Sequence, residues 1–259
     1  MVEGDKSDNK MLGVDVGGTG IKAAVVDVEA MRLVTERVRV PTPQPSTPER
    51  VAGVVAELVD TLGWEGPVGI GLPALIRGEV VVRGNNLDPS WQDIPAVEFF
   101  EEALGCPVVV ANDADLAGLA EVRYVPGLRE VRKLLFLTLG TGVGSAFFYY
   151  GQLIPEFEIG SMRYKKGILE EYISNTARKS KGMSWEQYGR KLSRALRYLY
   201  DIFSPDAFVI GGGLSKKFEH FEPHFSWREV SITPARLLNN AGIIGAALYA
   251  YQNFKNVDG

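Results

Sequence analysis

The chain has 259 residues, of which 46% are hydrophobic and 23% charged, a composition ordinary for a globular protein of one or two domains. No run approaches the roughly 18 apolar residues of a membrane-spanning helix, so we expect no membrane segment. The net charge of −4 and the single cysteine, Cys106, exclude an overall basic protein, an intrachain disulfide and a multi-cysteine zinc site. The polar first ten residues predict a flexible tail without a signal peptide, and hence a cytoplasmic protein.

The first half of the chain predicts strands that alternate with helices. Apolar runs indicate five strands, at 11–16, 21–28, 33–40, 67–72 and 107–111. A proline-rich connection leads to a helix that we expect to be capped by Ser46 or Thr47, with Pro48 in its first turn. A second helix is expected over 96–104.

The second half repeats this order. Strands are expected at 133–139, 145–150 and 207–210, a basic helical stretch over 167–203, and a final helix over 240–254. Such alternation favours α/β layers, and the repetition indicates two similar lobes with a cleft between them. No helix-turn-helix or coiled-coil pattern is present, so we expect no nucleic-acid partner.

Two glycine-rich turns of the same type carry the strongest functional signal. They are Asp15-Val16-Gly17-Gly18-Thr19-Gly20 and, about 125 residues later, Leu139-Gly140-Thr141-Gly142-Val143-Gly144. Glycine permits positive φ and lets backbone amides approach a ligand closely. Amide dipoles that converge on one point favour an anion, so the two turns together predict a site for one phosphorylated donor.

Other interpretations of these glycines compete. A single Gly-Gly-Thr-Gly is more often a plain hairpin turn. Neither turn is a Walker loop or a dinucleotide fingerprint, because no Gly-Lys-Ser/Thr follows and strand-type residues stand where a helix would begin. The repetition, with Asp15 before the first turn and Lys22 after it, favours phosphate binding.

Asn112-Asp113 follows directly on a predicted buried strand. The carboxyl end of a parallel strand is where α/β folds place their ligands. An aspartate there can accept the proton of an attacking hydroxyl in phosphoryl transfer. Asn and Asp are also good helix N-caps, and the two roles can coexist.

Three further segments are weaker candidates. Asn85–Trp91 offers amides and a carboxylate suited to sugar hydroxyls, although an ordinary surface turn explains it equally well. The segments 158–161 and 169–172 each add a carboxylate after the second glycine turn, and each alone fits a solvated side chain. Gly211-Gly212-Gly213 leaves room for a flat ring or a phosphate, or makes a tight strand-to-helix turn.

Positive charge is concentrated between Gly160 and Tyr200. This segment holds ten Lys or Arg and three Glu, a net charge of +7 in a chain whose total is −4. A solvated helix face is the simpler interpretation. The alternative is a track that binds a polyanion.

These motifs resemble those of the ROK family of sugar kinases, over about 11–251. The two glycine turns resemble its phosphate motifs, Asn112-Asp113 its catalytic base, and Ile210–Gly213 its nucleoside-side turn. Within the family, Thr42–Glu49, Asn86–Trp91, Ser184-Trp185 and Asn239–Ile243 are most similar to the polyphosphate glucokinase branch. The resemblance implies a two-lobed actin-like ATPase (ribonuclease H-like) fold, with a small lobe over 11–112, a large lobe over 113–239 and helix 240–254 crossing back to the small lobe.

The resemblance also implies transfer of phosphate from polyphosphate, and usually from ATP, to the 6-hydroxyl of glucose, with Mg²⁺ and without zinc. Asp113 is then the general base, and Asp15 orients the metal. The phosphate-binding residues are expected to be Asp15, Gly17, Gly18, Thr19, Gly20, Lys22, Gly140, Thr141, Gly142 and Gly144, with Gly211, Gly212 and Gly213 on the nucleotide side. The sugar-binding residues are expected to be Asn86, Asn112, Asp113, Glu158, Ser161 and Glu170, and the polyphosphate track Lys165, Lys166, Arg178 and Lys179. A homodimer is expected from the family.

One departure concerns the sugar. The family pattern has a sugar-binding histidine where this chain has Ser161, a shorter side chain that is never cationic. The alternatives are therefore an ATP-dependent kinase for glucose or another hexose, such as mannose or an acetylated amino sugar, and a non-catalytic sugar sensor.

Overall fold

The computed structural model describes residues 9–84 and 87–255, which form two compact units. The first unit contains the chain up to Ala120 and from Asn240 onward, and the second contains Glu121–Asn239. The lobe limits expected from the sequence stay a prediction. Within the described ranges, no helix has both the length and the apolar character needed to span a membrane.

The first unit is built on a six-stranded sheet with the order β3-β2-β1-β5-β8, in which β4 also pairs with β2. Strands β1 (Lys10–Gly17) and β2 (Gly20–Asp27) form an antiparallel hairpin, while β5 (Val68–Leu72) and β8 (Val108–Asn112) run parallel to β1. Valine, isoleucine and leucine dominate these strands because both faces of the sheet are covered.

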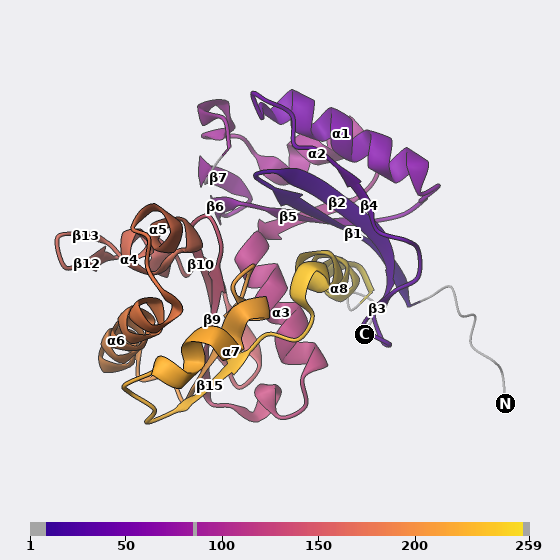
Figure 1. The fold of residues 1–259 in the computed structure, drawn as a ribbon. Coiled ribbons are helices and arrows are strands. Elements are labelled where there is room, and N and C mark those ends of the chain that lie inside the picture. The colour runs from indigo at the N-terminus through magenta and orange to yellow at the C-terminus, as the bar shows by residue number, and fades with distance from the viewer. Residues whose placement is uncertain (1–8, 85–86, 256–259) are drawn as a thin grey trace, which may run out of the picture. The chain divides into compact units, whose positions relative to one another are not determined.

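Helices α1 (Pro48–Thr61) and α2 (Ala96–Leu104) pack together on one face of this sheet, and α8 (Ala241–Lys255) packs on the other (Figure 1). Leu12, Val14 and Val16 point into the core shared with α1 and α2. The intervening residue, Gly13, lies against α8, because successive side chains of a strand point to opposite faces.

Glycines allow α8 to approach the sheet at backbone distance. A Cβ atom at Gly13 would lie 2.0 Å from the carbonyl oxygen of Ile243, and one at Gly69 would lie 1.9 Å from that of Ala246. Gly245 of α8 is equally close to helix α3 (Asp113–Tyr124), because a Cβ at Gly245 would lie 1.8 Å from the carbonyl oxygen of Leu116. Side chains at these positions would force the helix away.

The second unit repeats the sheet pattern with the order β11-β10-β9-β14-β15. Strands β9 (Lys133–Leu139) and β10 (Val143–Tyr149) form an antiparallel hairpin that β11 (Gln152–Ile154) extends. On the other side, β14 (Ala207–Gly211) and β15 (Ser231–Pro234) run parallel to β9. Each sheet is thus a hairpin followed by parallel strands, as the repeated sequence pattern predicted.

A group of helices covers one face of the second sheet. The longest is α6 (Trp185–Phe203), and the shorter ones are α4 (Glu170–Ile173), α5 (Asn175–Ser180) and α7 (Phe218–Phe221). Side chains of α6, with Phe221 and Trp227, pack on the inward residues of β9 and β14.

The prediction of one helical stretch over 167–203 was wrong. Residues 163–168 form the small hairpin of β12 (Arg163–Tyr164) and β13 (Gly167–Ile168), and three separate helices follow. Ser174 caps α5 by accepting a hydrogen bond from the amide of Ala177, and Ser184 caps α6 in a reciprocal capping box with Gln187. Gly182, with φ of 57°, separates these two helices.

The prediction of one strand over 33–40 was also wrong, because two short strands, β3 (Arg32–Leu33) and β4 (Val38–Val40), pair separately with β2. Between them the amide of Val25 donates to the hydroxyl of Thr35 rather than to a backbone oxygen, which interrupts the ladder. Four further strands among the described residues were not predicted from the sequence: β6 (Ala74–Arg77) and β7 (Val80–Gly84), which form a hairpin, and β11 and β15.

One test separates the close helix-to-sheet contact from a general intolerance to substitution. Gly69→Ala is expected to lower the free energy of unfolding by about 1–3 kcal/mol, because its methyl group overlaps the backbone of α8. Gly53→Ala, in an exposed and unobstructed position of α1, is expected to raise it by about 0.5–1 kcal/mol. Urea unfolding of both variants measures this, and equal stability of the two would contradict the packing described.

Candidate active site

The first glycine turn is the tip of the β1–β2 hairpin. Gly17 pairs with Gly20 in the strand register, so that Gly18 and Thr19 form the exposed tip. Neither Gly17 nor Gly20 has a left-handed φ. A Cβ at Gly20 would lie 2.6 Å from Nε of Arg39, so a larger residue there would displace this guanidinium from its place beside the turn.

Arg39, on β4, is a residue that the sequence analysis missed. Its Nη2 donates to the carbonyl oxygen of Thr19 at 2.9 Å, and the hydroxyl of Thr42 donates to the carbonyl oxygen of Gly17. These two hydrogen bonds fix two carbonyl groups of the turn in place. The signal for Arg39 was its place on a strand that pairs with β2, directly opposite Lys22.

Asp15 and Lys22 face each other across the same hairpin. They are register partners, and Nζ of Lys22 lies 2.7 Å from Oδ2 of Asp15, with both side chains partly buried. Gly242, in the first turn of α8, makes room for the carboxylate, because a Cβ there would lie 2.8 Å from Cγ of Asp15. The helix N-terminus adds a favourable field for this negative charge.

The residues present fit a Mg²⁺ ion shared with a phosphorylated ligand. Magnesium in phosphate-transferring sites is held by one or two carboxylates, water and the phosphates themselves. Asp15 supplies one such carboxylate beside the turn. No group of three or more His, Cys, Asp or Glu that would enclose a metal occurs in the part of the chain that the structure describes.

The second glycine turn occupies the same place in its own sheet. Leu139 pairs with Val143, and the amide of Gly140 donates to the oxygen of Gly142 at 3.1 Å across the turn. The amide of Asn175 donates to the oxygen of Gly140 at 2.9 Å, which fixes the turn to the start of α5. Gly144 pairs with Thr138 inside the ladder and therefore belongs to β10 rather than to the turn.

A cavity of about 390 Å³ opens beside this second turn. Glu170 reaches the turn closely enough that a Cβ at Gly142 would lie 2.7 Å from its Oε2. The residues that line the cavity include Thr141, Glu170, Glu171, Ser174, Thr176 and Lys181. Hydroxyl groups, carboxylates and an ammonium thus converge at Thr141, the exposed residue of the turn.

The third glycine segment follows β14. Gly211 ends that strand, and Gly212 has φ of 72°, a value that L side chains rarely adopt. A Cβ at Gly212 would also lie 2.6 Å from the amide nitrogen of Leu139, while Leu214 donates its amide to the oxygen of Leu139. This turn therefore packs directly against the residue that begins the second glycine turn, and a Cβ at Gly213 would meet open space.

Asp113 lies at the junction of β8 and α3, the carboxyl end of a parallel strand. Its Oδ1 accepts a hydrogen bond from the amide of Ala114 at 2.9 Å, and the residue is partly exposed. Asn112 is the helix cap, because its Oδ1 accepts from the amides of Ala114 and Asp115. Asn112 also donates its side-chain amide to the oxygen of Ala74 at 3.0 Å, so it orients the start of the helix.

The residues expected to bind sugar differ in their burial and in whether the structure describes them. Asn86 lies outside the described residues. Trp91 is fully buried and donates Nε1 to the oxygen of Ser46 at 2.8 Å, so it belongs to the core rather than to a sugar-binding loop. Glu158 is half-buried and Ser161 exposed, at the two ends of a short 3₁₀ turn (Ile159–Ser161) that follows β11.

The four cations expected to form a track differ in their surroundings. Lys165, Lys166 and Lys179 are exposed, and Nζ of Lys165 lies 5.3 Å and 5.6 Å from the ring centres of Tyr164 and Tyr172. Arg178 is half-buried, with its guanidinium 4.1 Å from the ring centre of Trp185 and Nε donating to Asn175. The guanidinium of Arg178 is therefore held by a cation–π contact with Trp185 of α6 and by the hydrogen bond to Asn175.

Comparison with known proteins agrees with this architecture. The ROK family profile matches residues 11–155. A polyphosphate glucokinase of Mycobacterium tuberculosis (strain CDC 1551 / Oshkosh) is 38% identical over 237 residues, which cover 91% of this chain and 89% of that protein.

Solved structures give the same picture. The inorganic polyphosphate/ATP-glucomannokinase from Arthrobacter sp. strain KM matches with a TM-score of 0.89 at 41% identity, over 94% of this chain and 99% of that one. A ROK family glucokinase from Streptomyces griseus, solved in complex with glucose and AMPPNP, matches with a TM-score of 0.80 at 26% identity, over the same shares. The structure is thus an α/β protein of the actin-like ATPase fold. The chain belongs to the ROK family.

The contribution of the second glycine turn to anion binding can be tested by removing one hydroxyl group, that of Thr141. Thr141→Val removes a hydrogen-bonding group without changing side-chain volume, and we expect it to weaken pyrophosphate binding by about threefold to tenfold. Isothermal titration in the presence of Mg²⁺ measures this. Thr233→Val, an exposed substitution on β15, is the matched control and is expected to bind as the parent does. Unchanged binding by Thr141→Val would remove Thr141 from the site.

Proposed function

We propose that this protein is a sugar kinase that transfers the terminal phosphoryl group of inorganic polyphosphate, or of ATP, to the 6-hydroxyl of glucose. The observation that carries the proposal is the repeated hairpin turn, one in each unit, in a chain similar to proteins named for this donor and this sugar. A donor with a chain of phosphates suits two sets of backbone amides.

In this proposal Asp113 is the general base. Its carboxylate accepts the proton of the sugar hydroxyl while the hydroxyl oxygen bonds to the terminal phosphorus. The bond from that phosphorus to its bridging oxygen breaks, and the shortened polyphosphate or ADP leaves with the negative charge. The cap formed by Asn112 fixes the start of α3 and thereby the position of the base.

The remaining phosphate contacts are assigned to the two hairpin turns and to the strand residues that flank them. Gly17, Gly18, Thr19, Gly20 and Lys22 serve the donor in the first unit, and Gly140, Thr141, Gly142 and Gly144 serve it in the second. Gly211, Gly212 and Gly213 serve the nucleoside side when ATP is the donor. Asp15 would hold Mg²⁺, directly or through water, and the bound ion would neutralise part of the charge of the phosphates.

The sugar contacts are assigned to Asn86, Asn112, Asp113, Glu158 and Glu170, with Ser161 where the family pattern has histidine. Serine is short, so we propose that a water molecule completes the contact with the sugar. This leaves room for hexoses besides glucose, and the name of the Arthrobacter relative includes mannose as well as glucose. We also propose a cytoplasmic homodimer, on the family resemblance alone.

The second candidate is an ATP-dependent kinase of the same family, which the similarity to the Streptomyces griseus glucokinase favours. A coupled assay of glucose 6-phosphate formation with polyphosphate and with ATP distinguishes the two. We expect turnover with both donors, and with glucose and mannose as acceptors. Activity with ATP alone would establish the second candidate, and sugar binding without turnover would establish a sensor.

A further inference from the structure

We propose that a second, strongly cationic cavity formed by Lys181, Arg190, Lys191 and Arg194 binds the distal phosphates of a long polyphosphate chain. The inference rests on the proposed use of polyphosphate. It goes further by assigning the binding of the chain to four cations of the basic segment other than Lys165, Lys166, Arg178 and Lys179. It lies wholly within the second unit.

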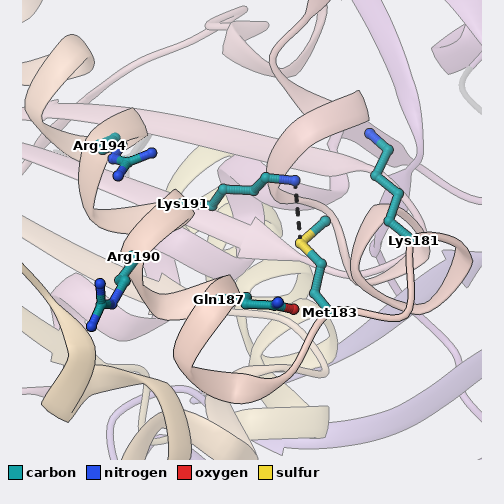
Figure 2. A pocket seen from close by; sticks show the side chains of 6 residues that line it. All are labelled: Lys181, Met183, Gln187, Arg190, Lys191 and Arg194. Carbon is teal, nitrogen blue, oxygen red and sulfur yellow. Dashed lines mark hydrogen bonds between the residues drawn. The ribbon is translucent and has the colours of Figure 1, made fainter.

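The cavity has a volume of about 390 Å³ and is lined by four cations together with Met183 and Gln187. Figure 2 shows Arg190, Lys191 and Arg194 projecting from α6 and Lys181 from the segment that precedes it. The α6 residues at 187, 190, 191 and 194 follow the three- and four-residue spacing that places side chains on one face of a helix. The spacing explains why separate positions in the sequence form one surface.

Positive charge in this cavity is poorly compensated. No acidic residue lines it, and the one described ion pair of its four cations joins Arg190 to Glu186 at 2.8 Å. Nζ of the half-buried Lys191 contacts the sulfur of Met183 at 3.4 Å, which offers a weak acceptor and no charge (Figure 2). Burial, together with the nearby charges of Lys181 and Lys165, lowers the pKa of Lys191.

Mutual repulsion among these groups makes the cavity favourable for a polyanion. A bound chain of phosphates replaces repulsive pairs by attractive ones and gives Lys191 an acceptor of opposite charge. Consecutive phosphates carry one or more charges each, so a chain offers the four cations more negative charge than a single phosphate ion does. The chemistry therefore indicates an extended polyphosphate rather than one phosphate ion.

Lys181 connects this cavity to the second phosphate turn. It lines both cavities, and the other cavity contains Thr141. Its ammonium lies 5.1 Å from the ring centre of Tyr172 and donates to the oxygen of Glu171, contacts that position the group without neutralising it. A phosphate chain that starts at Thr141 can thus pass Lys181 and continue to Lys191 and Arg194.

The inference predicts that dependence on chain length resides in α6. The test compares Lys191→Gln, Arg194→Gln and the double variant with Arg129→Gln, an exposed substitution in the second unit that removes one positive charge, as each single variant does, and lines neither cavity. The value of kcat/KM is measured with ATP, tripolyphosphate and polyphosphate of about 100 units. Loss of a charge-assisted contact is expected to cost the double variant at least tenfold with the long polymer. ATP, tripolyphosphate and the control are expected to change less than twofold.

Two further measurements make the result decisive. Lys191→Arg, which keeps the positive charge, is expected to retain use of the long polymer that Lys191→Gln loses. Fluorescence anisotropy of labelled polyphosphate is expected to show weaker binding and a smaller salt dependence in the double variant. Equal losses with ATP and with the polymer, or no loss beyond the control, would overturn the inference while leaving the kinase intact. A parent protein inactive with every polyphosphate but active with ATP would instead overturn the donor proposal, and this inference with it.

Discussion

The contact between helix α8 and the first sheet is the constraint on which the arrangement of the first unit depends. Gly13 and Gly69 have no side chain at the points where the backbone of α8 crosses β1 and β5, so the helix and the strands pack at backbone distance. Gly242 then brings the first turn of α8 beside the carboxylate of Asp15. The close packing thus determines the surroundings of a proposed metal-orienting group. The tip of the β1–β2 hairpin, proposed to bind phosphate, begins at Gly17–Gly18 just beyond it.

The two sheets share the same arrangement of hairpin and parallel strands. In each, a hairpin turn projects from a strand that also pairs with a parallel neighbour, β5 in the first sheet and β14 in the second. The surroundings of the turns differ. Arg39 supports the first, while Asn175 and Glu170 contact the second. Similar backbone frames therefore carry different side chains.

Sequence reasoning found the elements whose patterns are strong. Helices α2 and α8, and the buried strands β1, β5 and β9, begin and end within about two residues of the predicted limits, because apolar periodicity and glycine or proline boundaries coincide there. It missed the breaks at Ser174, Gly182 and Ser184, where local capping outweighs helix propensity. The core role of Trp91 was missed because a tryptophan after polar residues does not reveal whether it is buried.

The proposed site was predictable in part. Turn composition revealed both hairpin tips, and the strand before Asn112 revealed the place of Asp113. The role of Arg39 could be seen only from the pairing of β4 with β2, and the cationic face of α6 only from the residue at which α6 begins. Because both elements were predicted with wrong limits, neither feature was recognised in the sequence. With α6 assigned from residue 185, the spacing of Arg190, Lys191 and Arg194 would have indicated the second cavity.

The central claim is that Asp113 removes the proton of the acceptor hydroxyl. Asp113→Asn keeps the size of the side chain and an oxygen able to accept the bond from Ala114. The decisive measurement is kcat for glucose phosphorylation by this variant, alongside its affinity for glucose. The account predicts a fall in kcat of about 10²–10⁴-fold with glucose affinity retained. A near-normal kcat would contradict it.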